Sequence, residues 1–289
     1  MIIDAHLHVW DLARANYPWL GPGAGDLYRT IDIAEIEPTL QQRRIEGVVL
    51  VQASDEAGDT AVMRTAAAMH PMVLGIVAWS PLDDPERLAV ALERFVADPL
   101  VVGIRNLVHE HPPAWLERPE VEEGFALLAS HDFPFDFPTA DPAALAALPG
   151  IGERHPKLTI VIDHLGKPPI GGTAAERDSW RALLAECARN PRTVAKLSGL
   201  YSARGALDSW TLEQVRPFAD DAFELFGADR LLYGGDWPIS ELAGGYARTW
   251  DATCELLAGC DEAARDAVLG GNAARVYALD ADRIAAVTA

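Results

Sequence analysis

Eight short apolar runs, rich in β-branched residues, recur along the chain and alternate with longer stretches of helical periodicity. Near-continuous apolar strands of this kind are typical of a parallel sheet whose two faces are both buried. The predicted strands are 2–9, 47–54, 72–79, 101–108, 133–139, 158–166, 194–200 and 231–238. Eight such strand–helix units predict an α/β fold, a closed (β/α)8 TIM barrel that forms a single domain over residues 1–289. An open doubly wound sheet is the alternative, but no G-x-G-x-x-G pattern follows the first strand.

Two local features refine this barrel. The segments "DPERL" and "DPAAL" each predict an aspartate cap with proline at the first helical position. Residues 10–34 contain no clear element and follow the first predicted strand. Because loops after barrel strands lie at the catalytic face, we interpret this long loop as a lid or substrate loop.

Composition excludes several classes of function. The chain carries 24 basic and 43 acidic residues, a net charge of −19, which disfavours nucleic-acid binding. It has no apolar run long enough for a membrane span and no secretory signal at its start. The three cysteines, an odd number without a C-x-x-C pair, argue against disulfides and zinc fingers and favour a cytoplasmic location. A small molecule is the expected partner, and nothing in the sequence specifies an oligomeric state.

Polar residues at the strand ends are the candidates for chemistry, because barrel active sites lie at that end of the strands. In strand order these residues are His6, His8, Gln52, Ser54, Trp79, Ser80, Arg105, Asn106, Asp136, Asp163, His164, Lys196, Ser198 and Asp236. His6 and His8 share the parity of one strand face, so both imidazoles could ligate one divalent ion. The alternative for this pair is polar filling of the core.

Asp236 and His164 are candidate catalytic residues. Asp236 could act as a metal ligand, as a general base, or as both in turn, and its alternative role is a turn or helix cap. His164 could polarise a carbonyl group or bind a metal, and its alternative is a buried histidine bonded to the backbone.

The remaining candidates would contact substrate. Arg105 lies on an apolar strand, where an arginine needs an anionic partner, and it could bind the oxygens of a polar substrate. Gln52, Trp79 and Trp237 are further candidate substrate contacts, although tryptophans are more often simply core residues. Lys196 could equally form a structural ion pair.

Six motifs together resemble the amidohydrolase superfamily: "DAHLHVWD", "GIRN", "DHLGKP", "KLSGL", "YGGDWP" and "GGNAARVYAL". They extend from residue 4 to about residue 279, in order and at eight-strand spacing. The branch that they resemble includes rhamnono- and fucono-lactonases and dicarboxylate lactonases. The resemblance implies a (β/α)8 barrel whose active site contains His6, His8, His164 and Asp236 as catalytic residues and Arg105 as the strand-four arginine.

The resemblance also bears on metal content. The fuller metal-dependent pattern of the superfamily adds a strand-four lysine or glutamate and a strand-five histidine. Here strand four carries Arg105, and the strand-five segment "FPFDFPT" has no histidine. The resemblance therefore implies at most one divalent cation, zinc by preference, held by His6, His8 and Asp236 with His164 as a further candidate. Some members of the branch work without metal, so metal-free catalysis remains an alternative.

The leading functional hypothesis is hydrolysis of a lactone by water that Asp236 activates. The "YPWL" segment, residues 17–20, resembles the sugar-lactonase members and favours an aldonolactone as substrate. Three alternatives stand beside it: a metal-dependent decarboxylase of an aromatic or unsaturated acid, a muconolactone or dicarboxylate lactone hydrolase, and a non-catalytic ligand-binding barrel.

Overall fold

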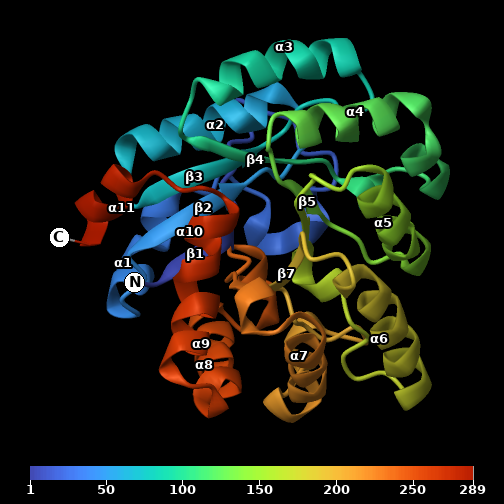
Figure 1. Ribbon diagram of the computed structural model, residues 1–289. Helices are drawn as coiled ribbons and strands as arrows, with labels where there is room; N and C mark the ends of the chain where they lie inside the picture. Colours follow the sequence, from blue (N-terminus) through green and yellow to red (C-terminus); the bar gives the residue numbers. More distant parts are fainter. Residues whose placement is uncertain (289) are drawn as a thin grey trace.

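The computed structural model describes residues 1–288 and shows eight parallel strands around a central axis with helices outside them (Figure 1). Each strand pairs with the next along the chain, so the predicted (β/α)8 barrel is confirmed. The strands are β1 Ile3–Leu7, β2 Gly47–Val51, β3 Val73–Ala78, β4 Val101–Arg105, β5 Phe135–Phe137, β6 Ile160–Ile162, β7 Thr193–Leu197 and β8 Leu231–Tyr233. They are shorter than the predicted runs, because the last residues of each run belong to the loops at the carboxyl end of the barrel and because β5 and β6 each begin two residues later than predicted.

The helices follow the strands as the alternation predicts. They are α1 Glu37–Gln42, α2 Ala57–Met69, α3 Pro85–Val96, α4 Pro119–Ser130, α5 Pro142–Arg154, α6 Ala174–Ala188, α7 Leu212–Phe226, α8 Tyr246–Leu256, α9 Glu262–Asp266, α10 Asn272–Val276 and α11 Ala281–Thr288. Both predicted aspartate caps are present: Asp84 accepts a hydrogen bond from the backbone of Arg87, and Asp141 accepts one from Ala143. Among the described residues, no helix combines the length and apolar character that crossing a membrane requires.

The barrel closes between its first and last strands. The backbone N–H of Asp236 donates to the carbonyl of His6 at 2.8 Å, and that of His8 donates to the carbonyl of Trp237 at 2.7 Å. Gly234 makes this approach feasible, since a Cβ atom there would lie 2.6 Å from the Cβ of His6. The closing hydrogen bonds therefore bring the carboxyl end of β8 alongside the two histidines of β1.

The opposite end of the barrel is filled from the C-terminal segment. Tyr277 and Leu279 are buried in one apolar cluster with residues near the strand starts, such as Ile3, Leu74 and Val194. The Tyr277 hydroxyl reaches up to the Asp136 carboxylate at 2.9 Å. Packing of these side chains closes this end of the barrel.

The long loop after β1 is folded rather than irregular. It contains a 3-10 turn at Pro22–Leu27, and a backbone bridge joins Trp10 to Ile31. Its Tyr17 hydroxyl donates to Asp59 Oδ1 at 2.8 Å, and Trp19 Nε1 donates to the carbonyl of Ala53 at 2.7 Å. The loop is therefore fastened to the β2–α2 connection.

Asp59, at the start of α2, makes this fastening pH-sensitive. Burial raises the pKa of Asp59 from 3.8 to about 6, against the opposing effect of its hydrogen-bond donors, which include Ala53 and Tyr17. Between these two pKa values the unfolded carboxyl group loses its proton while the folded one keeps it. We therefore expect Asp59 to lower the free energy of unfolding by about 2 kcal/mol as pH rises from 4 to 6, out of about 3 kcal/mol over the whole transition. In Asp59→Asn that component should vanish, leaving a flatter pH dependence in urea unfolding. Equal slopes for the variant and the wild type would contradict this origin.

Candidate active site

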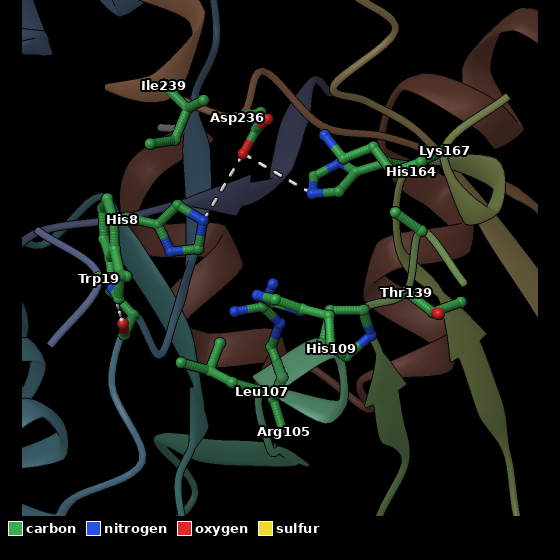
Figure 2. Close-up of a pocket in the computed structure, with 13 residues that line it drawn as sticks. His8, Trp19, Arg105, Leu107, His109, Thr139, His164, Lys167, Asp236 and Ile239 are labelled. Atoms are coloured by element: carbon green, nitrogen blue, oxygen red, sulfur yellow. Dashed lines mark hydrogen bonds and ion pairs between the residues drawn. The ribbon is translucent and has the colours of Figure 1, made fainter. Parts of the chain in front are cut away.

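A cavity of about 260 Å³ opens at the carboxyl end of the barrel (Figure 2). Its lining residues come from the segments that follow β1, β2, β5, β6 and β8, from the end of β4, and from the long first loop. They are His8, Trp19, Ala53, Arg105, Leu107, His109, Pro138, Thr139, Ala140, His164, Lys167, Asp236 and Ile239. The cavity therefore lies where barrel chemistry is expected.

His6, His8 and Asp236 converge at the floor of this cavity. His6 Nε2 lies 3.1 Å from His8 Nε2, and Asp236 Oδ1 lies 3.7 and 3.6 Å from these two nitrogens. In neutral His8, Nδ1 donates to the carbonyl of Val51 at 2.7 Å, so its Nε2 presents a lone pair. Burial and the Lys196 ammonium hold the pKa of His6 well below 6.5, which keeps the His6 ring neutral. The Lys196 ammonium can only donate to His6 Nδ1, so His6 Nε2 carries the ring proton and faces the lone pair of His8 Nε2 and the carboxylate of Asp236.

Asp236 is ionised throughout the neutral pH range. Burial alone would raise the pKa of Asp236, but His164, His8 and Lys167 outweigh burial and lower that pKa to about 2. The backbone of Asp236 is left-handed, with φ of 52°. The N–H of Asp236 makes the barrel-closing hydrogen bond to the carbonyl of His6. A carboxylate in this state can accept a proton or bind a cation.

His164 completes the group from the other side of the cavity. Its Nε2 lies 3.8 Å from Asp236 Oδ1 (Figure 2). Its Nδ1 lies 2.8 Å from the Ser198 hydroxyl. Burial and the nearby Lys167 hold the pKa of His164 well below 6.5. Burial also lowers the pKa of Lys167 from 10.5, while the Asp236 and Asp163 carboxylates counteract that shift.

A fully buried ion cluster supports these residues from below. Lys196 contacts the Asp136 carboxylate and lies 3.1 Å from Asp163 Oδ1 and 3.0 Å from His6 Nδ1. Arg105 Nε donates to Asp163 Oδ2 at 2.8 Å. Lys196 thus forms the structural ion pair that its sequence position allowed, and Asp163 is neutralised from two sides.

The atoms at the cavity floor fit a single metal ion. Ligands of tetrahedral zinc at about 2.0–2.1 Å stand roughly 3.3 Å from one another, and the three distances among His6, His8 and Asp236 are 3.1, 3.7 and 3.6 Å. The outer nitrogen of His8 faces the carbonyl of Val51, as is usual behind metal-bound histidines, whereas that of His6 lies 3.0 Å from the Lys196 ammonium and 3.3 Å from Asp163 Oδ1. A second cluster of His6, Asp163 and His164 has comparable spacing, but Arg105 and Lys196 already neutralise Asp163.

Comparison with known proteins identifies this architecture. The family model described as amidohydrolase matches residues 3–279. The chain belongs to the amidohydrolase family. A curated L-fucono-1,5-lactonase of Burkholderia ambifaria is 33% identical over 285 residues, covering 96% of each chain, and another of Burkholderia multivorans is 31% identical with the same coverage. A solved amidohydrolase of Burkholderia multivorans with bound zinc superposes with a TM-score of 0.87 at 29% identity, over 97% of this chain and 100% of that one.

The amidohydrolase barrel brings together five of the residues singled out in the sequence. His6, His8, Arg105, His164 and Asp236 all lie at or beneath the cavity. The other three candidate substrate contacts do not line it. Gln52 donates instead to Asp55 and to the carbonyl of Arg105, Trp237 is packed in the core, and Trp79 is absent from the lining.

Sequence reasoning missed several lining residues of this amidohydrolase. His109, Thr139 and Lys167 line the cavity from loops, and the sequence did not assign them to it, although Thr139 ends the predicted strand 133–139 and Lys167 lies in the motif "DHLGKP". A compositional signal for Lys167 exists. The chain contains only three lysines against 21 arginines, and two of the three, Lys167 and Lys196, lie at the site.

We predict that this amidohydrolase binds one zinc ion per chain at the cavity floor. His8→Ala and Asp236→Ala should each weaken zinc binding by more than about 100-fold, because even changes behind a metal ligand cost 10- to 100-fold. Metal analysis after equilibrium dialysis measures this. His131→Ala, at an exposed histidine that ends α4, is the matched control and should retain full binding. Unchanged zinc affinity in both cavity variants would rule out the site.

Proposed function

We propose that this amidohydrolase hydrolyses the ring ester of a sugar lactone. The convergence of His6, His8, His164 and the ionised Asp236 around one cavity carries the proposal, since the group offers a proton acceptor beside groups that can hold a carbonyl oxygen. The curated relatives named as L-fucono-1,5-lactonases support the substrate class.

The chemistry requires water to attack the ring carbonyl. Asp236 accepts a proton from that water, a bond forms between the water oxygen and the carbonyl carbon, and the ring C–O bond breaks. The proton then passes to the ring oxygen, which leaves as a hydroxyl group of the product. Because the pKa of Asp236 is about 2, the carboxylate is in its acceptor form before the reaction begins.

A divalent ion held by His6, His8 and Asp236 would supply Lewis-acid polarisation of the carbonyl and a lower pKa for bound water. The chain's own residues then orient the substrate. Arg105 donates from Nε to Asp163 and from one terminal nitrogen to the carbonyl of Gln52 at 2.7 Å. Those bonds fix the guanidinium plane at the cavity wall and leave its remaining N–H groups for sugar hydroxyls.

The cavity also suits a sugar ring in size and character. Its volume, about 260 Å³, is slightly below the roughly 300–1,000 Å³ of sites for drug-sized ligands, so it matches a monosaccharide. Trp19, held by its bond to Ala53, gives one wall a flat aromatic surface of the kind that stacks on sugars. Since Arg105 is already paired with Asp163, a lactone carrying two carboxylates would find fewer free cations here.

The test is a panel of aldono-1,4- and aldono-1,5-lactones assayed by proton release, with and without chelator. We expect turnover of at least one sugar lactone, and Asp236→Asn should lower kcat by roughly 10²- to 10⁴-fold while circular dichroism shows an intact fold. Asp178→Asn, at an exposed position on α6, serves as the matched control. Near-normal turnover by Asp236→Asn would sink the role of Asp236. Release of CO2 from an aromatic or unsaturated acid, without lactone turnover, would assign the barrel to decarboxylation instead.

A further inference from the structure

Lys167 occupies a position that the chemistry above leaves unused. It follows β6, lines the cavity together with Asp236, and lies beside His164 on the wall opposite His8 (Figure 2). The other two lysines differ in place: Lys196 is sealed below the cavity with no exposed surface, and Lys157 precedes β6 at the far end of the barrel. Lys167 is thus the one lysine of the three that reaches the cavity.

An unusual backbone turn delivers this side chain. His164, Leu165, Gly166 and Lys167 all have left-handed conformations, with φ values of 55°, 53°, 68° and 54°. Each non-glycine residue in this region costs roughly 1–2 kcal/mol. The backbone N–H of Lys167 donates to the carbonyl of His164 at 2.9 Å, which closes one left-handed turn and sets both side chains against the same cavity.

Packing holds this costly turn in place. Leu165 has no exposed surface, and Trp180 of α6 donates from Nε1 to the carbonyl of Leu165 at 2.8 Å. Backbone strain of this kind persists only where the surroundings over-determine it, and it concentrates at functional sites. The result of the strain here is the joint placement of the His164 imidazole and the Lys167 ammonium.

The Lys167 ammonium lacks a carboxylate partner. Its Nζ lies 3.5 Å from the carbonyl of Gly199 and 5.5 Å from the centre of the Tyr201 ring. Within residues 1–288, no carboxylate oxygen lies within 4.0 Å of it, whereas Arg105 and Lys196 each pair with Asp163. In a chain of net charge −19, a cavity-facing cation left without an ion pair is a binding group for an anion.

We propose that Lys167 holds the negative charge that forms during lactone opening, an inference that rests on the proposed function. The ammonium hydrogen-bonds the carbonyl oxygen as water adds to the carbon, and it then holds the carboxylate of the hydroxy acid after the ring C–O bond breaks. Asp236 takes one proton of the attacking water and passes it to the ring oxygen, the second proton of that water leaves the new carboxylic acid for solvent, and Lys167 keeps its own protons throughout. A donor that is already in place where negative charge develops stabilises that charge without reorganisation.

Binding of the product acid tests the inference without turnover. L-fuconate carries the carboxylate, and L-fucitol replaces it with an alcohol. The difference between their affinities, measured by calorimetry, is therefore the contribution of the carboxylate to binding. Lys167→Met should weaken L-fuconate binding by at least about 10-fold, as expected for one charge-assisted hydrogen bond. Lys167→Arg should retain most of the affinity, and L-fucitol should bind all forms equally. Lys157→Met is the matched control and should match the wild type. If Lys167→Met binds L-fuconate like the wild type, or if the wild type does not bind it, the inference is wrong.

Kinetics provide the second readout. Lys167→Met should lower kcat for the best lactone by about 100-fold, the usual cost of one oxyanion donor, with a smaller change in KM. A purely structural lysine would instead lower the melting temperature and leave kcat of the folded protein unchanged, and Lys167→Gln repeats the test if Lys167→Met does not fold. Lactone turnover that is independent of Lys167 would overturn this inference and leave the proposed function standing. If L-fuconate binding depends on Lys167 but no lactone is turned over, the proposed function is wrong and Lys167 remains a binding group for the carboxylate.

Discussion

The ammonium group of Lys196, buried on the barrel axis, is the contact on which the site depends. A cation with no exposed surface is costly unless carboxylates surround it, and Asp136 of β5 and Asp163 after β6 do so. Arg105 of β4 also pairs with the Asp163 carboxylate. The Lys196 ammonium contacts His6 of β1 and so positions its ring. Strands from both halves of the barrel are thereby locked in register beneath the cavity. This cluster orients His6 and Arg105 for the cavity above it.

The seam between β1 and β8 supplies the second constraint. Hydrogen bonds of Asp236 and Trp237 with the backbone of β1 place a carboxylate and two imidazoles within 4 Å of one another. The same residues therefore close the fold and assemble the site. Glycine at position 234 is required by this closeness, because any side chain there would collide with His6.

The barrel and its central group could be predicted from the sequence because both follow from strand order. Eight apolar runs, each followed by a helix, favour a closed parallel sheet over an open one, and closure brings the last strand, with Asp236, to the first strand, with His6 and His8. Gln52, Trp79 and Trp237 show where strand-end polarity fails, because a polar residue at a strand end can turn toward the backbone or the core. Lys167 could not be placed at all, since its position depends on a left-handed turn at residues, such as Leu165, that rarely adopt one.

The seam also has a thermodynamic consequence. In an open chain, β1 and β8 are separated by nearly the whole sequence, and only a few backbone hydrogen bonds join them here. Any ligand held jointly by His8 and Asp236 ties the first strand to the last, much as a ring closure would. Its binding free energy adds to the stability of the whole barrel, so occupancy of the cavity and resistance to unfolding must rise together.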